Sequence, residues 1–192
     1  MAAALPLAAN VQWARAELHP EDPVTTHLSD DEKRERLREL MKDFHVAMLS
    51  THTPEGGVRS RPLAIADHRA DGALYFSTAV ESPKVGELEA DPRVNVTMQD
   101  GRRFISITGT GRVVDDRALV DKLWSESWKI WFPKGKDDPS IRILVVDPSE
   151  AAYWDASGAQ GLKYAFEMAK AYVSGTRPPS NDDEAHVARV KL

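Results

Sequence analysis

One stretch of the chain combines side chains that could bind an anion. Arg59 and Arg61 lie two positions apart in an extended segment, so both should project from the same face of a strand. Thr78 is expected to end the next strand, and Ser82 followed by Pro83 has the sequence of a helix N-cap and first helical position. A helix N-terminus with a nearby ammonium group favours a phosphate dianion, and arginines can add bidentate contacts to it.

The same residues also have an ordinary interpretation. Serine is common at helix N-caps, and paired arginines on strands are usually solvated. The chain contains neither a GxGxxG sequence after a strand nor a GxxxxGK[ST] sequence, so neither nucleotide-binding motif supports the phosphate site. The local chemistry alone therefore predicts a plausible but generic anion site.

Other kinds of chemistry have less support. The chain has no cysteine, which excludes disulfides, thiolate metal ligands and cysteine nucleophiles. Its six histidines show no HExxH spacing, and no GxSxG elbow indicates a serine hydrolase. His45, His52 and His68 remain candidates for an axial ligand if the chain binds haem.

Composition indicates a single globular domain. The 192 residues include 30 acidic and 25 basic side chains, a net charge of −5, which argues against a nucleic-acid or anionic-membrane surface. No apolar run approaches the roughly 20 residues of a membrane-spanning helix. Met1–Ala9 lacks a cationic segment and contains Pro6, so we expect no secretory signal and a cytoplasmic location.

The expected elements alternate between strand and helix periodicity. Ser29 and Glu32 form a capping box before a helix from about Asp30 to Asp43. Shorter helices are expected after the Ser82 N-cap, ending before Asp91-Pro92, over 118–126 and around 162–173. Strands are expected over 45–51, 58–66, 74–78, 94–98, 103–114, 141–146 and 151–154, the last two separated by Asp147-Pro148, with a further short strand over 187–192.

This order predicts a mainly β, α+β fold, a six-stranded antiparallel barrel decorated by helices. Parallel βαβ units are absent from the pattern. Gly109 and Gly111 share one face of a long strand and predict a bulge or bend of the kind that barrel closure needs. We divide the chain into a loosely ordered arm over 1–28, a barrel domain over 29–174 and a tail over 175–192.

The span from Ser29 to Tyr172 resembles the general-stress-protein branch of the pyridoxamine 5′-phosphate oxidase-like split barrels, which bind flavin mononucleotide (FMN). That resemblance implies a split barrel that forms a homodimer with two FMN sites in its interface. The matching segments are His45–Ser50, Arg59–Pro62, Leu74–Thr78 with Ser82 and Lys84, Asp91–Val96, Ser106–Gly109, Trp131–Pro133 with Gly135 and Asp137–Pro139, and Tyr153–Asp155.

The resemblance also implies positions for the cofactor. The phosphate would lie near Ser77, Thr78, Ser82 and Lys84, assisted by Arg59 or Arg61. Arg61 is also a candidate for a cation near the N1–C2 carbonyl of the flavin. Phe104 would face the flavin from the partner chain, and Trp131 or Trp154 could cover a ring face, although the tryptophan cluster could equally be packing. The flavin edge would run along Arg59, Ser60, Arg61, Pro62, Leu63 and Ala64.

Three departures from the oxidase argue against pyridoxamine-phosphate oxidase activity. Pro83 stands where the oxidase has an arginine, and Phe104 stands where it has a glutamine. The oxidase arginine that grips pyridoxal phosphate has no clear counterpart. The first hypothesis is therefore an FMN-dependent oxidoreductase with an unidentified small-molecule redox partner. A non-catalytic flavin-binding or redox-stress protein is the second, and a split barrel that uses haem or a deazaflavin is the third.

Overall fold

The computed structural model describes residues 27–69, 71–176 and 187–192. The predicted arm, apart from its last two residues, and the connection over 177–186 lie outside these residues. Helix α1 (Asp30–Met41) begins at the predicted capping box, in which the Ser29 hydroxyl accepts from the Glu32 amide and the Glu32 carboxylate accepts from the Ser29 amide. The apolar face of this helix, with Leu37, Leu40 and Met41, is buried in the main core.

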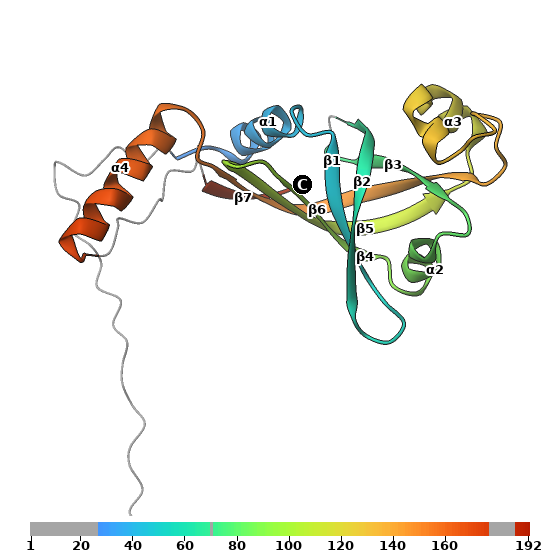
Figure 1. The fold of residues 1–192 in the computed structure, drawn as a ribbon, viewed down its shortest axis with the longest axis horizontal. Helices are drawn as coiled ribbons and strands as arrows, with labels where there is room; N and C mark the ends of the chain where they lie inside the picture. Colours follow the sequence, from blue (N-terminus) through green and yellow to red (C-terminus); the bar gives the residue numbers. More distant parts are fainter. Residues whose placement is uncertain (1–26, 70, 177–186) are drawn as a thin grey trace, which may run out of the picture.

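Six antiparallel strands form a closed barrel (Figure 1), which confirms the predicted fold class. Their order is β3-β2-β1-β4-β5-β6, and a pairing between β3 and β6 closes the ring. The strands are β1 (Val46–His52), β2 (Val58–His68), β3 (Leu74–Ala79), β4 (Arg93–Gln99), β5 (Arg103–Val114) and β6 (Ile141–Asp155).

The Asp147-Pro148 pair does not separate two strands, so that prediction is wrong. β6 is continuous over 15 residues, and β5 pairs with it along both halves. Opposite Pro148 the register shifts between Thr108 and Gly109, and the residue that the shift skips is Ser149 of β6. The irregularity therefore falls at the glycine where a bulge or bend was predicted. A Cβ at Gly109 would lie 2.2 Å from the Asp147 carbonyl oxygen, so only glycine lets the two backbones approach this closely.

The length of β6 lets two different strands share its other edge. Residues 141–146 pair with β3, and residues 150–154 pair with β7 (Val187–Lys191), the short last strand that the sequence predicted. The barrel therefore closes over only half of β6. The other half leaves the barrel and carries β7 and helix α4 (Gly158–Ser174) with it (Figure 1).

Apolar residues form two cores. The first fills the barrel, with Leu49, Phe76, Ile107 and Tyr153 among its fully buried side chains. The second lies on the outer side of β3 and β6, beneath helix α3 (Arg117–Leu123) and the short 3₁₀ helix η1 (Glu126–Ile130). Trp128 is buried in this second core and contacts Trp124 edge to face, so these two tryptophans are packing residues.

Candidate functional site

Lys84 lies at the start of helix α2 (Pro83–Ala90), where its ammonium group meets two hydroxyls. Nζ donates to Ser82 Oγ at 2.5 Å and to Thr78 Oγ1 at 3.1 Å, so the structure brings together the three residues of the predicted phosphate site. The Ser82 side chain makes no capping hydrogen bond, and the first turn of α2 carries no acidic residue. The helix therefore presents its positive end to this cluster.

Burial and a neighbouring cation both act on Lys84. The side chain is half-buried, and this desolvation, followed by the charge of Arg61, lowers the pKa of its ammonium group. The carboxylate of Glu87 partly offsets the effect. A dianion placed among these groups would be stabilised by two partly desolvated cations, Lys84 and Arg61.

Arg59 and Arg61 project from the same side of β2, as predicted, but here both contact Glu87. Arg59 Nη1 pairs with Glu87 Oε1, and Arg61 Nη2 donates to Glu87 Oε2 at 2.6 Å. Arg61 also donates to the Thr51 hydroxyl at 2.5 Å, and that hydroxyl donates to Glu87 Oε2 at 2.6 Å. Glu87 thus links β1 and β2 to α2.

Glu87 carries its charge despite being 3% exposed. Burial raises the pKa of its carboxyl. The hydrogen bonds from Thr51 and Arg61 and the charges of both arginines together lower the pKa by more than burial raises it, so the net pKa is below the usual value. Glu87 was not among the predicted site residues. The sequence did contain a signal for this residue. Two arginines of a strand face the helix that buries Val85 and Leu88, and a nearly buried arginine needs a counter-charge, which Glu87 of that helix supplies.

The other residues predicted to lie along the flavin edge are divided between the two faces of β2. Leu63 packs against the barrel core on the same side as the arginines. Ser60, Pro62 and Ala64 are exposed on the outer face, where Ser60 shares a 2.7 Å hydrogen bond with Ser50 of β1. A ligand that contacts both the arginine face and the outer face of β2 must therefore pass around the edge of this strand.

The remaining predicted residues do not gather around Lys84 within one chain. Ser77 is half-buried on β3. Phe104 and Trp154 are cross-strand partners on β5 and β6, and both are exposed. Trp131 follows η1 and is also exposed. Because α3 and α4 lie at opposite ends of the molecule (Figure 1), Trp131 and Trp154 belong to different surfaces, and their contact with a flavin stays a prediction.

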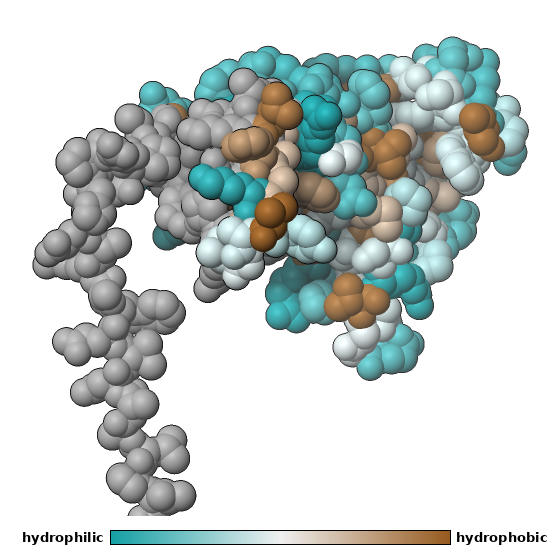
Figure 2. All heavy atoms as spheres, turned by 60° about the vertical axis from the view of Figure 1, so that its left-hand side comes forward, coloured by the Kyte–Doolittle hydropathy of each residue, from teal (hydrophilic) through white to brown (hydrophobic). Residues whose placement is uncertain are grey.

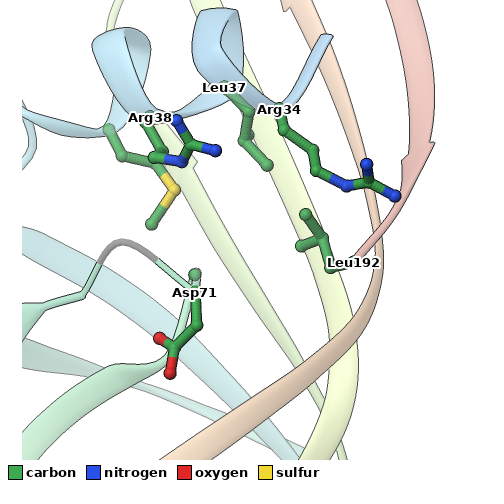
Figure 3. Close-up of a pocket in the computed structure, with 7 residues that line it drawn as sticks. Arg34, Leu37, Arg38, Asp71 and Leu192 are labelled. Carbon is green, nitrogen blue, oxygen red and sulfur yellow. The ribbon is translucent and has the colours of Figure 1, made fainter. Parts of the chain in front are cut away.

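A separate cavity of about 270 Å³ lies away from this cluster (Figure 3). It is lined by Arg34 and Arg38 of α1, the turn at Asp71 and Gly72, and Leu192 beyond β7. Both arginines already have acidic partners in their own helix, Asp31 and Glu35. None of the predicted site residues lines this cavity.

Comparison with known proteins identifies the family. A model described as pyridoxamine 5′-phosphate oxidase like matches residues 32–179, which is most of the chain. The chain belongs to this family. General stress protein 26 of Bacillus subtilis is 25% identical over 135 residues, covering 67% of this chain and 93% of that protein. Protein bli-3 of Neurospora crassa is 28% identical over 151 residues, covering 70% and 72%.

Solved structures agree with this family assignment. A candidate general stress protein 26 from Jannaschia sp. CCS1 is 25% identical and superposes with a TM-score of 0.60, covering 84% of this chain and 97% of that one. A protein from Xanthomonas citri, described as a general stress FMN/FAD binding protein, is 26% identical with a TM-score of 0.58, covering 67% and 92%. The recognised family, general-stress relatives and split-barrel fold are therefore confirmed.

Among the described residues, no helix is long and apolar enough to span a membrane. Nor do the described residues contain a group of three or more histidine or acidic side chains that could hold a metal ion.

Proposed function

We propose that this protein binds FMN and acts as an FMN-dependent oxidoreductase. The observation that carries the proposal is the Lys84 ammonium group, held between the Thr78 and Ser82 hydroxyls at the N-terminus of α2. Its donors suit a phosphate: two hydroxyls, a cation and a helix N-terminus free of acidic side chains. The flavin-binding neighbour from Xanthomonas citri supports the same cofactor class.

The chain's own residues would bind and orient the cofactor. Lys84, Thr78 and Ser82 would hold the phosphate, while Arg61, fixed by Glu87 and Thr51, would present a cation towards the ligand. FMN, when bound, supplies hydride and electron transfer. Glu87 is committed to two arginines, so no carboxylate in this cluster is free to act as an acid or base. The cofactor would therefore carry the redox chemistry.

The proposed site uses a homodimer. Phe104 and Trp154 lie on the exposed outer face of the sheet, away from the Lys84 cluster of the same chain. A second copy would bring its own outer face to this cluster and supply the aromatic cover that one chain lacks among its described residues. Pro83 and Phe104 replace charged and polar residues of the oxidase, which supports a substrate other than pyridoxamine phosphate.

Removal of the Lys84 ammonium group tests the phosphate assignment. We expect Lys84→Ala to weaken FMN binding by about 1–3 kcal/mol, the range for a lost charged hydrogen bond. Titration followed by flavin fluorescence measures the affinity, with the exposed Lys122→Ala in α3 as the matched control. Equal affinity in Lys84→Ala and the unsubstituted protein would refute the assignment, and a haem spectrum in the purified protein would refute the cofactor.

A second measurement separates the enzyme from a flavin carrier. Anaerobic addition of NADH or NADPH should bleach the absorbance of the bound flavin, and a defined acceptor should restore it. Flavin that binds tightly but is never reduced by either nucleotide or by other hydride donors would instead support the non-catalytic flavin-binding hypothesis.

A further inference from the structure

Helix α4 carries a line of apolar residues that the described part of the chain leaves exposed. Leu162, Phe166 and Val173 are 75%, 67% and 85% exposed, and with Ala169 they follow the spacing i, i+4, i+7, i+11. This spacing places the four residues on one face of the helix, and we call them the α4 stripe. Ala171, which is buried, lies on the opposite face.

The α4 stripe needs a partner for physical reasons. In proteins, most of the stability of a helix as short as α4, which has 17 residues, comes from packing of its apolar face. In Figure 1 the helix lies at one end of the molecule, beyond the barrel. Figure 2, which turns this end forward, shows hydrophobic side chains along its surface. An exposed apolar stripe of this kind marks a surface that another segment or molecule covers.

The sequence outside the described residues points to one occupant. Residues 177–186 contain no leucine, isoleucine, valine, methionine, phenylalanine, tyrosine or tryptophan, so they have no large apolar side chain to bury against α4. Residues 1–26 do have such side chains. They are Met1, Leu5, Leu7, Val11, Trp13, Leu18 and Val24.

The pattern of residues 1–26 also matches the α4 stripe. Leu7, Val11, Ala14 and Leu18 repeat the spacing i, i+4, i+7, i+11, which places them on one face if this stretch is helical. The segment contains one arginine and three acidic residues, whereas α4 contains two lysines and one glutamate. The two therefore carry side-chain charges of opposite sign, which favours their contact.

The segment joins the described chain close to the start of α4. The Asp155 carboxylate accepts a hydrogen bond at 2.8 Å from the amide of Ser157, the N-cap residue of α4, and pairs with Arg36 of α1. Arg36 lies about 10 Å along α1 from its first residue, at 1.5 Å per residue. At roughly 3.3 Å per extended residue, residues 1–26 are long enough to reach every turn of α4.

We propose that residues 1–26 pack along the α4 stripe of the same chain. Because the two are parts of one chain, the contact is intramolecular, which favours it over the same contact between separate molecules. The segment then buries its own apolar side chains and supplies the partner that α4 lacks among the described residues. The proposal requires neither a bound flavin nor a second copy of the chain, so it stands apart from the proposed function.

A single introduced thiol reports whether the α4 stripe is covered, because the chain has no cysteine of its own. Phe166→Cys is made in the full chain, with and without Val11→Asp, and its rate of reaction with a maleimide is measured. We expect Val11→Asp to raise this rate at least tenfold, since a carboxylate cannot be buried against an apolar stripe. Gln12→Asp, which lies outside the repeated spacing, is the matched control and should leave the rate unchanged.

A second thiol controls for effects on the whole fold. Ile130 is exposed on η1 at the other end of the molecule, so Ile130→Cys should react at the same rate with and without Val11→Asp. The double variant Val11→Cys/Phe166→Cys, treated with a short bismaleimide, should give a cross-link within one chain.

Three results would overturn the proposal. A Phe166→Cys thiol that reacts as fast as the Ile130→Cys thiol in the chain without Val11→Asp would show that the stripe is open. A protected Phe166→Cys thiol that Val11→Asp does not release would show that something other than residues 1–26 covers it. Cross-links of the double variant only between two chains, lost on dilution, would show that a second copy is the occupant.

Discussion

Glu87 shows how one side chain can set the charge and geometry of the candidate site. Its carboxylate receives hydrogen bonds from Thr51 of β1 and from Arg59 and Arg61 of β2, while the residue itself belongs to α2. Arg61 would otherwise be a nearly buried cation without a counter-charge. The carboxylate thus fixes the position of Arg61 and leaves Lys84, one turn earlier in the helix, to the hydroxyls of Thr78 and Ser82.

Neutralising Glu87 should reduce stability in a pH-dependent way. Its pKa in the folded protein lies below the usual 4.5, so the charged carboxylate stabilises the fold above that value, and the contribution is lost as pH falls through the lower folded pKa. We expect Glu87→Gln to lower the free energy of unfolding by about 1.5–3 kcal/mol at neutral pH. The difference from the unsubstituted protein should shrink as pH falls below 4.5.

Urea unfolding at neutral and acidic pH measures both quantities. The matched control is Glu89→Gln, because Glu89 is exposed in the same helix. A loss of stability that is the same at every pH would mean that Glu87 acts through packing and not through its charge.

At the scale of elements, the contact between β5 and β6 depends on one glycine. A Cβ at Gly109 would meet the Asp147 carbonyl at 2.2 Å and Pro148 Cα at 2.9 Å, both backbone atoms that cannot move without breaking the strand pairing. We expect Gly109→Ala to destabilise the protein by about 1–3 kcal/mol, the usual cost of overpacking. Thermal unfolding measures this change.

Gly86→Ala is the control for this substitution. Gly86 lies inside α2, and a Cβ there would meet nothing within 4 Å. Alanine at a helix interior should stabilise by about 0.5–1 kcal/mol. If both substitutions changed stability by the same amount and in the same direction, backbone proximity at the bulge would not be the cause.

Local sequence signals predicted most helices and strands, because the start and end of these elements depend on residues that are close together in the sequence. The capping box at Ser29 and the bulge at Gly109 are short-range features, and both are present. Pro148 misled the prediction of β6, because β5, a strand distant in sequence, pairs with β6 on both sides of the proline and the register shift skips only Ser149. No local pattern reports such a partner.

The candidate site shows the same division between local and long-range information. The cluster of Thr78, Ser82 and Lys84 was predictable from the turn between a strand and a helix. The engagement of Arg59 and Arg61 by Glu87 depends on how α2 docks against β1 and β2. In the proposed dimer, the positions of Phe104, Trp131 and Trp154 relative to a flavin would depend on a second chain, which no residue pattern within one chain can specify.

At the scale of the whole molecule, FMN binding and assembly should be linked. A ligand that binds only the folded protein stabilises it by about 2.7 kcal/mol at 100 times its dissociation constant. For a protein of this size that corresponds to a rise in melting temperature of roughly 5–10 °C, at about 2–4 °C per kcal/mol. Because the proposed site is completed by a second copy, FMN should bind the dimer more tightly than the single chain and should therefore lower the dimer dissociation constant.

Differential scanning fluorimetry with FMN and riboflavin measures the rise in melting temperature, and sedimentation with and without FMN measures the dimer dissociation constant. Riboflavin lacks the phosphate, so it should give a smaller rise than FMN, and Lys84→Ala should reduce the rise with FMN towards that of riboflavin. Equal rises with the two flavins would show that the phosphate contributes nothing. A dimer dissociation constant that FMN leaves unchanged would show that one chain holds the flavin without help from the second.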